Sequence, residues 1–164
     1  MILYIAENTE MPTFEEQKLN RWIEGTVTGY GKKTGDIAYI FCDDKRILEI
    51  NKQYLQHDYY TDIITFDDTV GNRISGDIFI SIDTVKANAE EYGVEFEDEL
   101  HRILIHGILH LCGNDDKSPE LRADMTAKEN LALEQLKLML LNSAFFNIEP
   151  CNATISLFLQ YFVK

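Results

Sequence analysis

The order of apolar, amphipathic and turn-forming segments predicts a fold of mixed helices and strands in the order βαβαββααα. Four short apolar runs indicate strands, and amphipathic segments that begin at capping residues or end at glycines indicate helices. The expected strands cover residues 2–7, 35–42, 61–66 and 76–82. The first expected helix begins at residue 14 and ends near Gly29 or Gly31, and the others cover residues 45–55, 83–93, 95–113 and 119–141.

Side chains at three expected helix starts support these assignments. Thr13 and Glu16 form a capping-box pattern at the start of the first helix. Asp43 or Asp44 can cap the second helix with its carboxylate. Ser118 stands as N-cap before a proline, a pair that is typical of a helix start, and it opens the last helix.

The bulk composition predicts one domain in a reducing compartment. A chain of 164 residues buries a core without disulfides, and we expect residues 1–141 to form the domain and residues 142–164 a C-terminal extension of unknown role. The three cysteines form no CxxC pair. No signal peptide opens the sequence, and no apolar run reaches the roughly 18 residues of a membrane span. The expected location is therefore the cytoplasm, away from membranes.

The charge balance bears on possible partners. The formal net charge is −13, and an acidic protein repels a phosphate backbone unless its basic residues are concentrated locally. The basic runs at residues 32–33 and 45–46 contain only two residues each. Composition alone therefore disfavours a general nucleic-acid binder.

One segment carries the pattern of a metal site. His106 and His110 lie four residues apart in an apolar helix, so their side chains share one row. Gly107 lets another backbone or a ligand approach this row. Gly113 ends the helix and allows the chain to turn back, so that Asp116 meets the two histidines. Two imidazoles and one carboxylate suit an open three-ligand zinc site with water in the fourth position.

Two other interpretations compete with the metal site. Histidines at helical spacing are more often surface or core residues than ligands, but unpaired imidazoles in this apolar run would cost about 1–3 kcal/mol each. The same spacing occurs in metalloproteases that carry a glutamate after the first histidine as general base. Gly107 occupies that position here, which disfavours a protease of that type.

Several segments resemble the YbeY family of endoribonucleases and ribosomal-RNA maturation factors. HGILHLCGNDD, at residues 106–116, is similar to the family's HGxLHLxGYDH signature. NKQYLQHDYYTDIITF resembles its Asn-rich helix end and TDVLSF strand, and SGDIFISIDTVKANAEEYG resembles its GDIxI strand with the helix that follows. EDEL stands where the family has an acidic helix start. The resemblance covers about residues 35–136 in the right order.

This resemblance implies an α+β fold in which a small mixed sheet of about four strands packs with about five helices, with the metal-bearing helix at the centre. It implies one zinc ion per chain and cleavage of single-stranded RNA in ribosomal RNA maturation and ribosome quality control. The implied partners are ribosomal RNA and the small ribosomal subunit or its proteins, while the oligomeric state stays open. His106 and His110 become the first two metal ligands.

The third ligand departs from the family pattern, because Asp116 occupies the position of the third histidine. A carboxylate is an ordinary zinc ligand, so the site can survive the change. The added negative charge should reduce the acidity of a metal-bound water and could favour a harder metal such as manganese or magnesium. Asp115 matches the family's preceding aspartate, and it either orients the loop or serves as the ligand in place of Asp116.

A second departure concerns phosphate binding. Leu55 stands where the family has an arginine, and a leucine cannot make the bidentate contact with phosphate that an arginine makes. Lys52, His57 and Arg102 are candidates to compensate, although each is more commonly an ordinary solvated residue. A phosphate-binding or catalytic role for these three side chains is therefore a hypothesis to test on the structure.

Residues before the third strand complete the candidate site. Thr61 and Asp62 match the family's TD pair, and hydrogen bonds at the strand start are their alternative role. If water is the nucleophile, the general base is a metal-bound hydroxide or the carboxylate of Asp62. Alternatively, the 2′-hydroxyl of the RNA is the nucleophile and the metal acts only as an electrostatic clamp. Tyr59 and Tyr60 offer rings on which a base can stack, although packing is their commoner role.

Two further functions remain open at this point. The first is a non-catalytic ribosome-assembly factor that keeps the metal for structure and docking, since a protein of net charge −13 suits basic ribosomal proteins better than naked RNA. The second, and less favoured, is a hydrolase that acts on a small or peptide substrate through the same metal.

Overall fold

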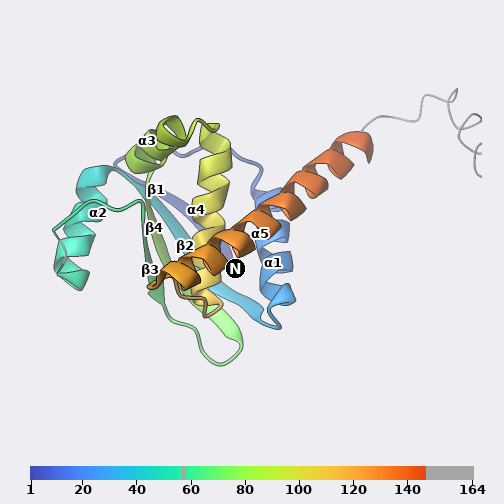
Figure 1. The fold of residues 1–164 in the computed structure, drawn as a ribbon, viewed down its shortest axis with the longest axis horizontal. Coiled ribbons are helices and arrows are strands. Elements are labelled where there is room, and N and C mark those ends of the chain that lie inside the picture. Colours follow the sequence, from blue (N-terminus) through green and yellow to red (C-terminus); the bar gives the residue numbers. More distant parts are fainter. Residues whose placement is uncertain (57, 147–164) are drawn as a thin grey trace, which may run out of the picture.

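The computed structural model describes residues 1–56 and 58–146, and it has the element order that the sequence predicts (Figure 1). The strands are β1 (Ile2–Glu7), β2 (Lys33–Cys42), β3 (Ile63–Asp67) and β4 (Arg73–Ser81). The helices are α1 (Glu16–Gly29), α2 (Asp44–Ile50) with the π-helical turn η1 (Asn51–Leu55), α3 (Ile82–Tyr92), α4 (Phe96–Leu111) and α5 (Pro119–Phe146).

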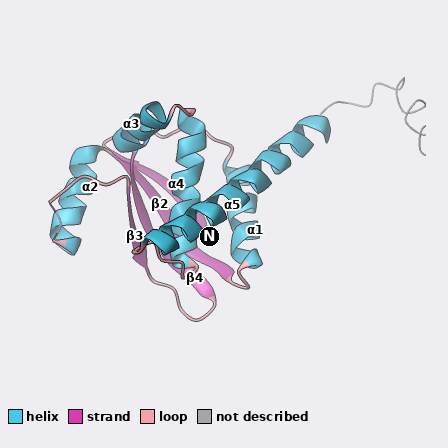
Figure 2. Ribbon diagram, viewed as in Figure 1, coloured by secondary structure: helices cyan, strands magenta, loops and turns pink. Residues whose placement is uncertain are grey.

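The strands of the described residues form one mixed sheet in the order β1-β2-β4-β3 (Figure 2). β1 and β4 both pair with β2 in parallel. β3 pairs with β4 in antiparallel and forms the edge of the sheet. The α+β architecture with a small mixed sheet is therefore confirmed.

The two faces of the sheet carry different layers because successive strand side chains point to opposite sides. One face packs against α1 and α4 and forms the main core. Part of the other face packs against α2, which contributes Ile47 and Ile50 to a smaller cluster with Cys42 and Ile64.

Helix α5 runs across α4 and α1 in Figure 1, and it packs against both. The indole of Trp22 on α1 donates a hydrogen bond to the carbonyl of Ala132, at 2.7 Å. The buried stripe of α5 recurs every three or four residues, as expected for a helix that packs on one side. Its members are Met125, Glu129, Ala132 and Leu136.

Some local predictions are confirmed and others are wrong. The N-H of Arg46 donates to the carboxylate of Asp43, and the N-H of Leu121 donates to the hydroxyl of Ser118, so both predicted caps are present. The capping box at Thr13 is absent, because the backbone carbonyl of Glu15 closes the first turn and α1 begins at Glu16 without a side-chain cap.

The predicted boundaries differ at other elements as well. The second helix is interrupted by the π-helical turn η1, while β2 and β4 start earlier than expected because Lys33 pairs with Arg73. Helix α5 continues past Leu141 to Phe146. The remainder of the predicted C-terminal extension, residues 147–164, lies outside the described residues. Within the described residues, every helix is too short or too polar to cross a membrane.

Candidate metal centre

The two histidines of the predicted site face each other on α4. His106 and His110 are one helical turn apart, and their rings meet edge to face with centroids 4.5 Å apart. The Nε2 atoms of the two rings are separated by 2.9 Å. Gly107 lies between them against the sheet, where an added Cβ would come within 3.0 Å of the Ile78 side chain. The glycine therefore allows α4 to pack closely over β4.

The outer nitrogen of each ring has an oxygen acceptor. His106 Nδ1 lies 2.7 Å from Oε1 of Glu129, and His110 Nδ1 lies 2.9 Å from the carbonyl of Asn114. A carbonyl only accepts, and a buried carboxylate does so when ionised, so both Nδ1 atoms carry the hydrogen. In the neutral rings both Nε2 atoms then present lone pairs to each other, a repulsion that a proton on one of them or a metal ion bound to both would relieve.

Asp116 supplies an anionic oxygen beside the two Nε2 atoms. Gly113 adopts a left-handed conformation with φ of 94°, which ends α4 and turns the chain back as the sequence predicts. Oδ2 of Asp116 lies 3.8 Å from Nε2 of His106 and 3.9 Å from Nε2 of His110. One ligand atom from each of these three residues lies within 4.8 Å of the other two. Two imidazoles and a carboxylate at these positions fit a divalent metal ion.

Glu129 is the residue at this centre that sequence analysis missed. Its side chain is 8% exposed, and its second oxygen accepts a hydrogen bond from Nη1 of Arg102 at 3.0 Å. A buried carboxylate is costly unless it is paired, and Glu129 is paired with both a guanidinium and an imidazole. Arg102, which was a candidate for phosphate binding, therefore lies against Glu129. Metal-ligating histidines usually donate their outer N-H to such an acceptor.

The surrounding charges favour a cation at His106. Burial lowers the pKa of its imidazole, but the hydrogen bond and charge of Glu129 raise it by more, with further contributions from Asp116 and Asp62. The net result is a raised pKa. The carboxylates around the ring thus stabilise positive charge at this position, whether a proton or a metal ion carries it.

The TD pair lies just before the edge strand. Thr61 donates its hydroxyl hydrogen to the carbonyl of Ile63, and the carboxylate of Asp62 accepts a hydrogen bond from the Asn88 amide at 3.4 Å. The carbonyl of Asp62 accepts from the N-H of Ser81. Both residues therefore make the strand-start hydrogen bonds that were their alternative role, while the charge of Asp62 reaches His106.

The other described candidates bind partners of their own, and one candidate lies outside the described residues. Lys52 forms an exposed ion pair with Asp58 at 2.8 Å, and His57 lies outside the described residues. The exposed carboxylate of Asp115 accepts the N-H of Asp116, which lowers the pKa of Asp115, and it also pairs with Lys117. Asp116, rather than Asp115, therefore faces the two Nε2 atoms.

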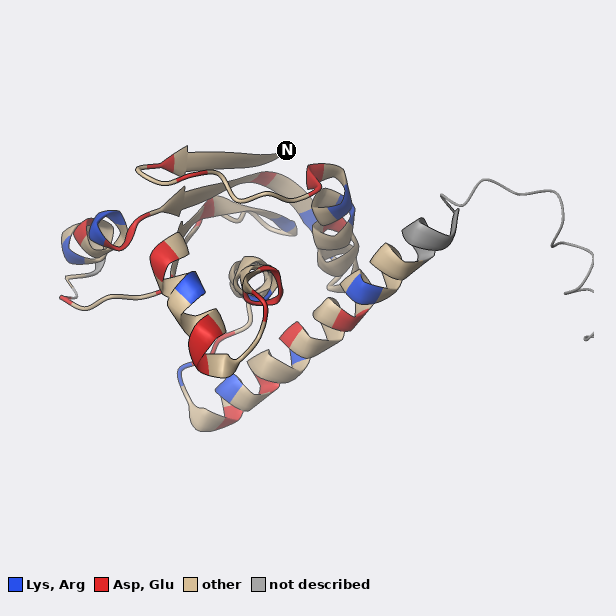
Figure 3. Cartoon of the chain, turned by 90° about the horizontal axis from the view of Figure 1, so that it is seen from above, with Lys and Arg blue, Asp and Glu red and all other residues tan. Residues whose placement is uncertain are grey.

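The Lys and Arg positions of the described residues are not gathered on one element of the ribbon in Figure 3. Acidic and basic positions alternate along α5, the longest helix, and Lys and Arg are spread over several elements. This distribution agrees with the absence of a long basic run in the sequence. The metal centre is itself bordered by carboxylates, so a bound cation would be the main positive charge there.

Fold and donor set together define a class of protein, namely an α+β protein with a His-His-Asp candidate metal site on a central helix. A family model described as Endoribonuclease YbeY matches residues 4–137, and the chain belongs to this family. The resemblance that the sequence motifs indicate is thus confirmed, and the family is one of metalloenzymes.

Named relatives and a solved structure agree with this assignment. An Endoribonuclease YbeY of Parabacteroides distasonis is 58% identical over 132 residues, which cover 80% of this chain and 93% of the relative. An Endoribonuclease YbeY of Phocaeicola vulgatus is 56% identical over 138 residues, which cover 84% of this chain and 100% of the relative. The solution structure of a Thermotoga maritima protein superposes with a TM-score of 0.59 at 26% identity, covering 92% of this chain and 99% of that one.

Proposed function

We propose that the chain is a metal-dependent endoribonuclease that cleaves single-stranded RNA during ribosomal RNA maturation in the cytoplasm. The observation that carries this proposal is the pair of Nε2 atoms at 2.9 Å, with an acceptor on each outer nitrogen and the carboxylate of Asp116 beside them. The relatives' names favour this activity over a non-catalytic assembly factor. The small ribosomal subunit is the proposed place of action, on the basis of the sequence resemblance alone.

His106, His110 and Asp116 are the proposed metal ligands, and zinc is the proposed ion. A bound zinc ion supplies a Lewis acid that polarises a phosphoryl oxygen and lowers the pKa of water. Nitrogen-rich donor sets suit zinc. The carboxylate of Asp116, in place of a third imidazole, makes the ligand set more negative and leaves manganese as the first alternative to test.

The remaining side chains have positioning and proton-transfer roles in this proposal. Glu129 holds the hydrogen of His106 on Nδ1, and Arg102 neutralises Glu129. Asp62 is the proposed proton acceptor for the attacking hydroxyl group, because its charge reaches His106 from the start of β3. Thr61 fixes the backbone at this point through its hydrogen bond to Ile63.

The two described cations that were candidates for phosphate binding each pair with a carboxylate. Arg102 contacts Glu129, and Lys52 contacts Asp58. We therefore propose that the metal centre itself makes the main contact with the scissile phosphate, which agrees with a leucine at position 55. Residues 1–141 form the proposed catalytic domain, and the C-terminal extension has no role in this proposal.

Metal analysis combined with an RNA cleavage assay tests the proposal. Purified wild type should contain about one divalent ion per chain and cleave an unstructured RNA, whereas His106→Ala should lose both properties. Asp115→Asn is the matched control and should retain both. Metal without cleavage in wild type would contradict the nuclease and favour the assembly factor. A metal-free wild type that stays metal-free after incubation with zinc or manganese would contradict the centre.

A further inference from the structure

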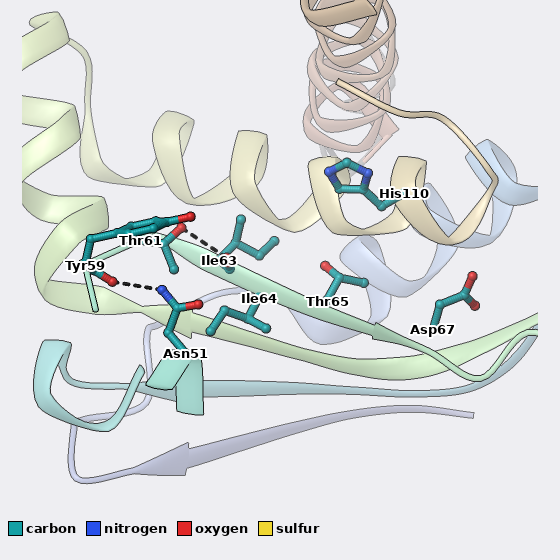
Figure 4. A pocket seen from close by; sticks show the side chains of 8 residues that line it. All are labelled: Asn51, Tyr59, Thr61, Ile63, Ile64, Thr65, Asp67 and His110. Carbon is teal, nitrogen blue, oxygen red and sulfur yellow. Dashed lines mark hydrogen bonds between the residues drawn. The ribbon is translucent and has the colours of Figure 1, made fainter. Parts of the chain in front are cut away.

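A pocket of about 370 Å³ lies along edge strand β3, directly beside the candidate metal centre (Figure 4). His110 forms part of its wall on the α4 side, and Asn51 and Tyr59 border it at one end. The volume is within the range of small-molecule sites in proteins. A ligand in this pocket would therefore touch a residue of the metal centre.

The lining of the pocket suits a neutral group rather than a phosphate. Among the described residues that line it, Asp67 and His110 are the only ones with acidic or basic side chains, and none is a lysine or an arginine. Ile63 and Ile64 contribute apolar surface, while Thr61 and Thr65 contribute hydroxyl groups. Apolar walls with a few polar groups are the usual surroundings of a planar heterocycle.

The hydroxyl of Thr65 is the polar group in this pocket that still needs a partner. Its Oγ1 atom is buried and has no hydrogen-bond partner among the described residues, whereas the hydroxyl of Thr61 donates to the carbonyl of Ile63. Thr65 lies in the middle of β3, below His110 in Figure 4. An unpaired buried hydroxyl is unfavourable. A ligand that offers a donor or an acceptor at this depth would remove that cost.

An aromatic ring borders the same pocket. Tyr59 is 57% exposed and lines the pocket at the end of β3 that is opposite Asp67. Aromatic side chains are the common stacking surface for unpaired bases, and every base has a face that can stack. The pocket thus combines a stacking ring, an apolar wall and an unpaired hydroxyl within reach of the metal centre.

We propose that this pocket is a subsite for one unpaired nucleobase of the RNA, with Thr65 as the residue that hydrogen-bonds the edge of the base. This assignment rests on the proposed nuclease function and extends it. Because a base must leave its helix to enter a pocket, the subsite gives a physical reason for a preference for single-stranded RNA. The phosphate next to that base would then lie at the metal centre.

A comparison of the binding of base-bearing and abasic oligomers tests the subsite. The probes are fluorescein-labelled 2′-O-methyl hexauridylate, hexaadenylate and an abasic 2′-O-methyl hexamer with the same number of phosphates, and anisotropy reports their affinity for the metal-loaded protein. The base-bearing hexamers should bind roughly 5- to 100-fold more tightly than the abasic one, the range expected for one stacked base. Equal affinities would overturn the subsite and leave an extended peptide along β3 as the candidate occupant.

Substitutions in the pocket locate the effect. Thr65→Val keeps the β-branched shape and removes the hydroxyl. It should therefore lower the affinity for the base-bearing hexamers several-fold and leave the affinity for the abasic hexamer unchanged. Tyr59→Ala should do the same, Tyr59→Phe should behave as wild type, and Tyr92→Ala on α3 is the control for an exposed tyrosine elsewhere. Equal losses of affinity for the base-bearing and abasic probes would overturn the role of Thr65. Melting curves of each variant identify misfolding.

A cleavage assay with unmodified RNA on the same samples separates the two proposals. Cleavage without any preference for base-bearing hexamers would overturn the subsite and keep the nuclease. Tighter binding of base-bearing hexamers by a wild type that cleaves no RNA would overturn the nuclease and keep the pocket as a site for unpaired bases.

Discussion

His101 and His106 lie on the same helix, five residues apart, and their surroundings shift their pKa values in opposite directions. His101 is 6% exposed and meets the edge of Trp22, with ring centroids 6.0 Å apart. Burial lowers its pKa, although Glu97 and Asp98 oppose this. Burial also lowers the pKa of His106, but Glu129 and the nearby aspartates outweigh it. Burial therefore does not make a metal site; the carboxylates that face the ring do.

The origin of those carboxylates explains the difference along α4. Glu129 reaches His106 from α5, and Asp116 reaches it from the turn after α4. His101, in the N-terminal half of the helix, packs instead against Trp22 of α1. Both halves of α4 contribute buried apolar residues to the core, and the carboxylates from α5 and the following turn make the site at His106.

The strongest test of this comparison exchanges the two histidines for apolar residues. We expect His106→Ala to lose nearly all of its metal, because one of three donor atoms disappears. His101→Phe should keep the wild-type metal content, which plasma emission spectrometry of dialysed protein would measure. If His101→Phe also lost its metal while its melting temperature stayed unchanged, the assignment of His101 to the core and of His106 to the metal centre would be wrong.

The second test compares the two aspartates of the turn. Asp116→Asn should lower the zinc affinity by about 100-fold or more, beyond the usual range for residues outside the ligand set, since an amide oxygen is a weaker donor than a carboxylate. Asp115→Asn should change it little, because the Asp115 side chain faces solvent and the N-H of Asp116. Competition with a chromophoric chelator measures both, and the reverse order would make Asp115 the ligand.

A third and smaller effect is expected at the acceptor of His106. Glu129→Gln removes the charge but keeps the shape, and it should reduce metal affinity by about 10- to 100-fold. The control is Glu134→Gln, an exposed glutamate on the same helix. Nitrogen NMR of the metal-free protein should show the His106 hydrogen on Nδ1 in the control and a changed tautomer population in Glu129→Gln. Identical spectra and affinities would remove Glu129 from the centre.

The smallest effect concerns pH and His101. Because burial lowers the pKa of His101 in the folded protein below its ordinary value of 6.5, the unfolded chain binds the proton more readily. Stability is therefore present above pH 6.5 and falls as the pH drops through the lowered folded pKa. His101→Phe removes this contribution, so its melting temperature should fall less between pH 7 and pH 5 than that of wild type. Parallel curves for the two proteins would show that His101 does not titrate on unfolding.

The sequence was sufficient for contacts that are local along the chain. The spacing of His106 and His110, the glycine turn and the return of Asp116 all depend on one helix and the residues just after it, and the structure places them as predicted. Glu129 could not be found in this way, because packing of α5 against α1 and α4 brings it to His106. A glutamate within the apolar stripe of α5 was the available signal.

Local rules also failed where packing overrides them. Thr13 fits the capping-box pattern, but the N-cap of α1 is Glu15, two residues later, and its backbone carbonyl closes the first turn. The helix predicted for residues 45–55 shares its end with a π-helical turn, which periodicity alone does not distinguish from an ordinary helix. Thr65 likewise looks like any strand residue until the pocket beside it is known.

The position of Glu129 in the last described helix has a consequence for synthesis. A ribosome makes His106 and His110 before it makes α5, so a growing chain contains both candidate ligands while the acceptor for His106 is still missing. The centre is completed only when α5 has been released and has packed across α4. A chain that stops before α5 would therefore carry all three candidate ligands without the acceptor of His106, and it should hold a metal ion more weakly than the full chain does.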